Sequence, residues 1–171
     1  MPPHPSIRTF GDPVLRSVCS PVERFDQSLL DRIAAMQEVM KQSGGVGLAA
    51  PQIGSLQRIL VYRLPCESEE AQDSQAAFRV LVNPEWESLD QGQQPAMEGC
   101  LSLPGIQLPV IRCYAIRVTG QDHLGRPVDF QAQDLEARII QHEVDHLDGK
   151  LILDRVDPQL RREAIMLLRQ S

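Results

Sequence analysis

The chain has 171 residues, of which 42% are hydrophobic and 23% are charged, and its formal net charge is −6. These values are typical of a globular protein in water, and the length predicts a single domain over residues 1–171. The acidic balance argues against direct nucleic-acid binding, and no apolar run is long enough to cross a membrane.

The beginning of the chain gives no sign of export, because residues 1–5 lack the charged and apolar regions of a signal peptide. The four cysteines include no C-x-x-C pair: Cys19, Cys66, Cys100 and Cys113. We therefore expect reduced thiols and a cytoplasmic protein, or an organellar one if a targeting segment has been removed.

The first periodic segment covers residues 28–42. Its apolar residues recur at helical spacing: Leu29, Ile33, Met36 and Met40. We expect a helix that begins at a capping box formed by Ser28 and Asp31 and ends before Gly44.

Residues 45–52 read Gly-Val-Gly-Leu-Ala-Ala-Pro-Gln. Glycines let a backbone approach another group closely or adopt positive φ, so local geometry favours a helix end that runs into a loop. The position of Gln52 argues against a plain loop, because Gln52 is a polar residue between Pro51 and an apolar residue. Residues 59–62 then predict a buried strand.

A polar, acidic stretch over residues 66–77 has no periodicity, and we expect a solvated loop there. A second strand is predicted at residues 80–82, closed by Asn83 and Pro84. At residues 98–105, Cys100 follows a glycine on a constrained segment or turn. A free cysteine in isolation is more often a small buried hydrophobe than a metal ligand.

Residues 111–119 are strand-like, and residues 122–127 predict a hairpin connection to a strand at 128–132, with His123 solvated in the turn. Asp157 is expected to cap a C-terminal helix that extends through Leu168. Four of its side chains are predicted to pack on the body: Leu160, Ala164, Met166 and Leu167.

The motif H-E-x-x-H starts at His142, between the strand at 128–132 and the C-terminal helix. We expect a helix capped by Asp134 and stopped at Gly149. Residues four apart leave the same helix face, so His142 and His146 can bind one metal ion, with Glu143 near enough to reach a water on it. The competing interpretation is a surface helix that carries two histidines by chance.

A catalytic site of this kind normally has three protein ligands. A third histidine is missing, because the position that would carry it in one class of metalloproteases is Ile152. Glu163 is available, but it lies among arginines in a helix that looks solvated. Cys100 is the more attractive candidate, and a site of two imidazoles and a thiolate suits Zn²⁺ or Fe²⁺.

Three stretches of the chain together resemble the signature motifs of peptide deformylase, in the same order and at similar separations. They are GVGLAAPQ at 45–52, EGCLS at 98–102 and QHEVDHL at 141–147. GDPVLR at 11–16 and the Asp-Gly pair at 148–149 also match, so the resemblance covers nearly the whole chain.

The resemblance implies that three side chains bind one catalytic divalent ion: Cys100, His142 and His146. It implies Fe²⁺ as the native metal, with Zn²⁺, Ni²⁺ or Co²⁺ able to substitute. Glu143 would be the general acid/base, while the Gln52 amide and the Leu101 N–H would form the oxyanion hole.

The implied reaction is removal of the N-formyl group from N-formylmethionyl nascent chains, with release of formate and a metal-bound water as nucleophile. The chain could meet these substrates at the ribosome. Gly45, Val46 and Gly47 would approach the substrate strand, and Leu135 and Ile139 would line the methionine pocket.

Two residues of this helix could have more than one structural role. Arg138 stands where some family members have an apolar residue, and it could face solvent, pair with a carboxylate such as Glu98, or border the pocket. Asp145 could support a metal ligand or be exposed.

The expected architecture is α+β, with antiparallel sheets packed around the central HExxH helix and an N-terminal and a C-terminal helix outside. Two alternatives compete with the deformylase interpretation. One is a zinc peptidase with Glu163 as third ligand. The other is a non-enzymatic protein, either a structural metal module closed by a fourth ligand such as Cys113 or His123, or an inactive relative that acts through binding.

Overall fold

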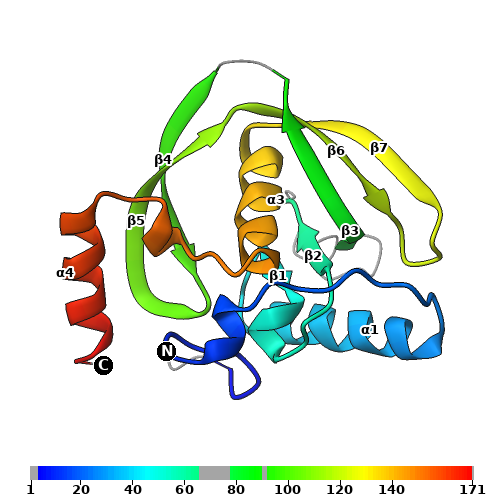
Figure 1. Ribbon diagram of the computed structural model, residues 1–171, viewed down its shortest axis with the longest axis horizontal. Coiled ribbons are helices and arrows are strands. Elements are labelled where there is room, and N and C mark those ends of the chain that lie inside the picture. The colour runs from blue at the N-terminus through cyan, green and yellow to red at the C-terminus, as the bar shows by residue number, and fades with distance from the viewer. Residues whose placement is uncertain (1–3, 66–77, 90–91, 171) are drawn as a thin grey trace.

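The computed structural model describes residues 4–65, 78–89 and 92–170 (Figure 1). All strand pairs are antiparallel, and they form a five-stranded sheet in the order β1-β2-β3-β6-β7 and a two-stranded sheet, β4-β5. The strands are β1 (Gly47–Ala49), β2 (Ile59–Arg63), β3 (Phe78–Ser88), β4 (Gln93–Cys100), β5 (Leu103–Cys113), β6 (Ala115–Gln121) and β7 (Pro127–Gln133).

Helix α3 (Asp134–Leu147) stands in the middle of the molecule, between the β4-β5 hairpin and the five-stranded sheet (Figure 1). Helices α1 (Gln27–Gln42) and α4 (Pro158–Leu168) lie outside, so the expected α+β architecture is confirmed. Short 3-10 turns cover Pro13–Arg16, Ala50–Ile53 and Ile152–Asp154. No helix in the described ranges is long and apolar enough to span a membrane.

The central helix is buried on almost all sides. From Ala137 to Leu147, every residue except His142 is buried. Its apolar residues pack against Leu60 and Tyr62 of β2 and Ile116 of β6. Because the polar residues of α3 are also removed from water, each needs a partner inside the protein.

The helix ends differ in detail from the expectation. Helix α1 is capped by Asp26, whose carboxylate accepts from the Leu29 N–H, so the capping box at Ser28 was wrong. The N-cap of α3 is Gln133, so the predicted cap at Asp134 was wrong. Asp134 is the first residue of the helix, and its carboxylate accepts a hydrogen bond from Gln94. Gly149 stops the helix as predicted, with φ of +70°.

Two predicted strand limits were wrong. Strand β3 does not close at residues 83–84 but continues through a bulge, where Asn83 adopts φ of +51°. The Asn83 side chain bonds both the N–H and the carbonyl of Val22, a distant contact that holds the bulge. The predicted strand at 111–119 is divided at Tyr114, where the chain passes from one sheet to the other. The expected loop at 66–77 lies outside the described residues.

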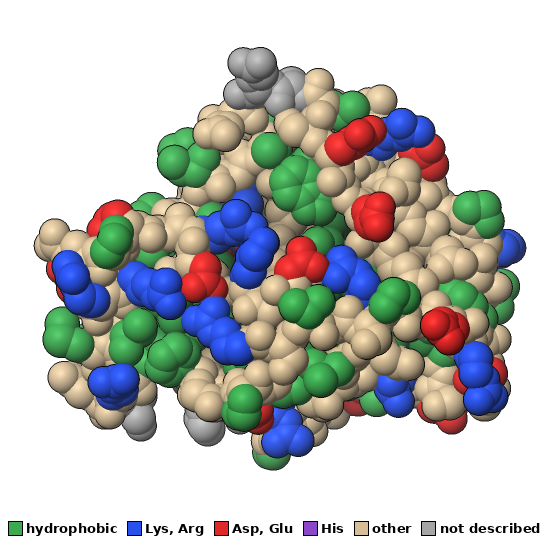
Figure 2. All heavy atoms as spheres, viewed as in Figure 1, with side chains coloured by type: hydrophobic (Ala, Val, Ile, Leu, Met, Phe, Trp, Pro, Cys, Tyr) green, Lys and Arg blue, Asp and Glu red, His purple; other side chains and the backbone are tan. Residues whose placement is uncertain are grey.

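Helix α4 begins at its Asp157 cap as predicted. Ala164 is buried and Leu160 half-buried, but Met166 and Leu167 are 57% and 58% exposed, so their predicted packing was wrong. The buried side of the helix instead carries Ile165 and Leu168, which pack with Ala164 against the β5 residues. On the face shown in Figure 2, Lys and Arg side chains gather left of centre, with Asp and Glu side chains among them.

Candidate metal centre and substrate cleft

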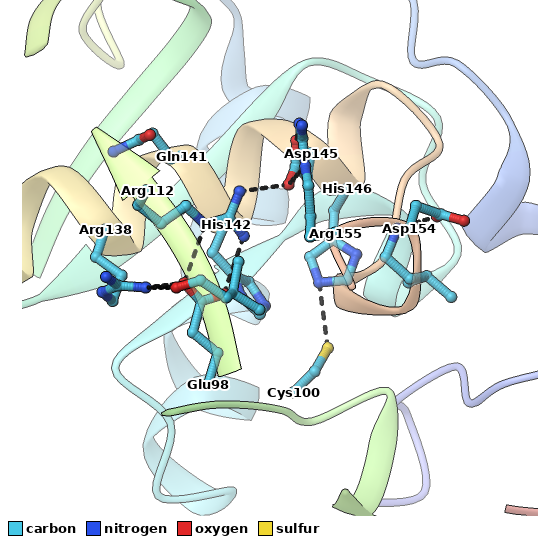
Figure 3. Close-up of polar contacts among 12 residues, drawn as sticks. Glu98, Cys100, Arg112, Arg138, Gln141, His142, Asp145, His146, Asp154 and Arg155 are labelled. Atoms are coloured by element: carbon cyan, nitrogen blue, oxygen red, sulfur yellow. Dashed lines mark hydrogen bonds and ion pairs between the residues drawn. The ribbon is translucent and has the colours of Figure 1, made fainter. Parts of the chain in front are cut away.

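Two elements far apart in the sequence bring three metal-binding side chains together. Cys100 ends β4, while His142 and His146 project from successive turns of α3 (Figure 3). The Cys100 Sγ lies 3.2 Å from Nε2 of His146, and one ligand atom of each residue lies within 4.8 Å of the others. A thiol and two imidazoles at this separation fit a divalent ion of the Zn²⁺ or Fe²⁺ type.

The alternative ligands lie elsewhere. Glu163 is exposed on α4 and accepts a hydrogen bond from Gln159, and His123 is exposed in the β6-β7 turn. Within the described ranges, the group around Cys100 contains three possible metal ligands, and Glu163, His123 and Cys113 are not among them. The geometry therefore fits a three-ligand site better than a closed structural one.

The β4-β5 hairpin is fastened to α3 by polar side chains. Gln141 of α3 accepts from the Cys113 N–H and donates to the Cys113 carbonyl, both at 3.0 Å. Arg138 donates to the carbonyls of Gln94 and Val110, one in each strand of the hairpin. These contacts fix the strand that carries the cysteine against the helix that carries the histidines.

Glu98 is the buried centre of this network (Figure 3). Its carboxylate accepts from Nδ1 of His142 at 2.9 Å, from Arg112 at 3.0 and 2.9 Å, and from Arg138 at 2.7 Å. Burial alone would raise the pKa of Glu98, but the hydrogen bonds from His142 and Arg112 outweigh it and lower the pKa to about 2. An ionised Glu98 that accepts from Nδ1 leaves Nε2 of His142 available to bind a metal ion.

The two residues with more than one possible role are now placed. Arg138 is buried, pairs with Glu98, and also lines the cleft described below. Asp145 is buried rather than exposed, and it pairs with Arg112 and with Arg155. It therefore supports the site through Arg112, which bridges the carboxylates of Asp145 and Glu98.

Arg112 and Ser102 were not identified from the sequence. In β5 the buried residues Leu108, Val110 and Arg112 alternate, so an arginine in the inward register was a signal of a buried acidic partner. Ser102 closes the EGCLS stretch but was given no role, because its role depends on contact with Gln52, fifty positions away.

Gln52 is buried, and both ends of its amide are held. Its Oε1 accepts from the Ala49 N–H at 2.9 Å, while Nε2 donates to Ser102 Oγ at 3.2 Å and lies 3.8 Å from Cys100 Sγ. The N–H₂ end of the amide is thus directed toward the metal-binding group. Leu101 follows Cys100 in the turn that joins β4 to β5.

Glu143 is 4% exposed, and burial raises its pKa to about 7. Its Oε2 is buried without a hydrogen-bond partner among the described residues. A carboxylate that is protonated and deprotonated near neutral pH can act as acid and base in turn.

These groups lie along a cleft of about 990 Å³. All five residues expected to contact substrate line it: Gly45, Val46, Gly47, Leu135 and Ile139. Cys100, His142, Glu143 and Gln52 line the same cleft. The volume is that of a small-ligand or peptide site.

Comparisons with known proteins agree on one family. The family model described as polypeptide deformylase matches residues 5–162. The chain is 43% identical to peptide deformylase 1 of Corynebacterium glutamicum over 96% of this chain and 94% of that protein. It is 44% identical to the peptide deformylase of Acidothermus cellulolyticus over 96% of this chain and 86% of that protein.

Solved structures give the same result. A peptide deformylase from Legionella pneumophila superposes with a TM-score of 0.85 at 37% identity, over 96% of this chain and 92% of that one. The peptide deformylase of Thermotoga maritima gives a TM-score of 0.79 at 41% identity, over 89% and 97%.

Proposed function

The chain belongs to the polypeptide deformylase family, and from that premise we propose how its residues divide the reaction among them. It is a metal-dependent hydrolase that removes the N-formyl group from nascent polypeptides. The observation that carries this function is the convergence of Cys100, His142 and His146, the first two of which line the cleft together with the first motif.

The proposed metal ligands are Cys100 Sγ and one ring nitrogen each of His142 and His146. A divalent ion held there would polarise the formyl carbonyl and lower the pKa of a water molecule. We propose Fe²⁺ as the native ion, with Zn²⁺, Ni²⁺ or Co²⁺ able to replace it. The thiolate and imidazole donors support these metals over Mg²⁺ or Ca²⁺, which prefer oxygen.

Glu143 is proposed to move the protons. It takes a proton from the attacking water and passes it to the amine that leaves when the formyl C–N bond breaks. Its burial and its pKa of about 7 support both half-steps near neutral pH.

Gln52 Nε2 and the Leu101 N–H are proposed to hold the oxygen that becomes negatively charged during attack. The two fixed ends of the Gln52 amide support this role, because a donor already oriented needs no reorganisation during the reaction. One such donor can be worth about 3 kcal/mol of transition-state stabilisation.

The substrate is proposed to lie along the first-motif loop, paired in a β-like manner with the backbone near Gly45, Val46 and Gly47. Leu135 and Ile139 would contact the methionine side chain. We further propose a single catalytic domain over residues 1–171 that acts on nascent chains at the ribosome, in the cytoplasm or in an organelle.

Formate release from a formyl-Met peptide tests this function, with Fe²⁺- or Ni²⁺-loaded protein prepared without oxygen. We expect metal-dependent release that is poor with an acetyl-Met peptide and lost in Glu143→Gln. Cys100→Ala should lose the metal, while Glu163→Ala should keep it. No turnover by protein that holds one ion at this site would overturn the proposal.

A further inference from the structure

Gly47 lies directly against the carboxylate of Glu143. A Cβ added to Gly47 would stand 2.4 Å from Oε1 and 3.0 Å from both Cδ and Cγ of Glu143. Gly47 is not among the glycines with positive φ, so its backbone would accept another residue. What excludes a side chain here is the space that Glu143 occupies.

The strand that carries Gly47 is well fixed. In the register of β1 and β2, Gly47 pairs with Tyr62 and Leu48 pairs with Val61. The side chains of Leu48, Val61 and Tyr62 are fully buried. Glu143, by contrast, has a buried Oε2 without a hydrogen-bond partner in the described part of the chain. The Glu143 carboxylate therefore lies against the backbone of a buried, paired strand, and no hydrogen bond to its Oε2 from the described residues fixes it from another side.

We propose that Gly47 is a positioning residue for Glu143: its missing side chain leaves the space in which the carboxylate is held for proton transfer. This inference rests on the proposed role of Glu143 as general acid/base. The earlier expectation was that Gly47 serves only the approach of substrate. In this inference Gly47 also acts on Glu143, the group that transfers the proton.

The contact also predicts how a variant behaves. In Gly47→Ala the atoms that must yield are the end of a flexible side chain, so the fold should tolerate the methyl group while the carboxylate moves. A displacement of about 1 Å at a reacting group can cost roughly 100-fold in rate. We expect kcat to fall by about 10- to 100-fold with KM nearly unchanged.

Gly45 supplies a matched control. It lies in the same loop, lines the same cleft and is also absent from the positive-φ glycines. A Cβ at Gly45 would meet Leu101 Cδ1 at 3.0 Å, and its three nearest atoms belong to Leu101, Gly47 and Met40 rather than to Glu143. If the loop glycines serve substrate approach alone, Gly45→Ala and Gly47→Ala should both raise KM and spare kcat.

The test is a double-variant cycle on formyl-Met peptide hydrolysis, with metal content and thermal unfolding measured for every variant. Gly47→Ala should lower kcat in the wild-type background and cause no further loss in Glu143→Asp, whose shorter side chain leaves room for the added methyl group. Retained kcat in Gly47→Ala, or an equal further loss in Glu143→Asp, would overturn the inference. Full turnover by Glu143→Gln would instead overturn the proposed function.

A second variant covers the case in which Gly47→Ala does not fold. Aspartate at position 143 is one methylene shorter, which withdraws the carboxylate from the added methyl group. Gly47→Ala/Glu143→Asp should therefore fold, bind metal, and hydrolyse peptide as fast as Glu143→Asp alone. Failure of the double variant to fold would show that Gly47 meets another constraint and would overturn the inference.

Discussion

Glu98 Oε2 accepts a hydrogen bond from Nδ1 of His142 at 2.9 Å, although the two residues are 44 positions apart. Glu98 lies two residues before Cys100 on β4, so this contact joins the strand of one metal ligand to the imidazole of another. The same carboxylate forms ion pairs with Arg112 and Arg138. Orientation of the metal site and stability of the buried network thus depend on one side chain.

Glu98→Gln should therefore weaken metal binding. An amide keeps the shape of the side chain but loses the charge that favours donation from His142, and it leaves two buried guanidinium groups less well paired. Loss of such a supporting partner typically costs 10- to 100-fold in metal affinity. Competition with a chelator measures it. Glu136→Gln is the control, since Glu136 lies on the same helix as His142 but pairs with Tyr62 and Arg79; an equal loss in both variants would contradict a specific role for Glu98.

Arg138→Met should destabilise the fold by about 1–3 kcal/mol, because the carbonyls of Gln94 and Val110 lose a buried donor. Glu98 keeps its two bonds to Arg112, so the loss should stay below that of breaking an isolated buried pair. Urea unfolding measures the change. Arg117→Met, which breaks an ion pair in the solvent-exposed part of the sheet, should have little effect; a similar loss there would argue against the hairpin contacts as the cause.

Stability should fall at alkaline pH through Cys19. Burial raises the pKa of this thiol from 9.0 to about 11, with opposite contributions from Arg58 and Asp148. A pKa raised in the folded state means that the contribution is fully present below pH 9 and is lost as pH rises toward 11. The loss should reach about 2–3 kcal/mol.

Urea unfolding of wild type and Cys19→Ala between pH 8 and pH 11 checks this expectation. Other groups titrate equally in both proteins, so the wild type should lose stability faster with pH than the variant does. Parallel pH dependences would refute the prediction.

Metal removal should lower the thermal unfolding temperature of the wild type. An ion that binds the folded state alone adds stability that grows with its concentration above the dissociation constant, about 2.7 kcal/mol at a 100-fold excess. Calorimetry with and without a chelator measures the shift. Cys100→Ala should unfold at the same temperature in both conditions, and a chelator-induced shift in that variant would place the ion elsewhere.

The sequence was most informative where the relevant geometry is local. The four-residue spacing of His142 and His146 needs only a helix, and Asp157 caps α4 through neighbouring N–H groups. Cys100 was chosen because the other candidates for the third ligand were weaker, and its motif supported the choice, since its meeting with the helix depends on how β4 packs.

The remaining features depend on contacts between distant segments. The β3 bulge depends on Val22, 61 residues from Asn83, and the buried face of α4 depends on where β5 lies. Arg112, Glu98 and Asp145 are polar residues whose burial follows from their mutual pairing, which no local pattern specifies.

Tyr114 is the one residue between β5 and β6, where the chain leaves the hairpin and enters the five-stranded sheet. So short a corner limits how far the end of β5, in one sheet, can move from the start of β6, in the other. Where a site is held in place before binding, a peptide that enters loses its own entropy but does not have to order the protein. We expect the width of the cleft to be set before substrate arrives, by the covalent chain at this corner.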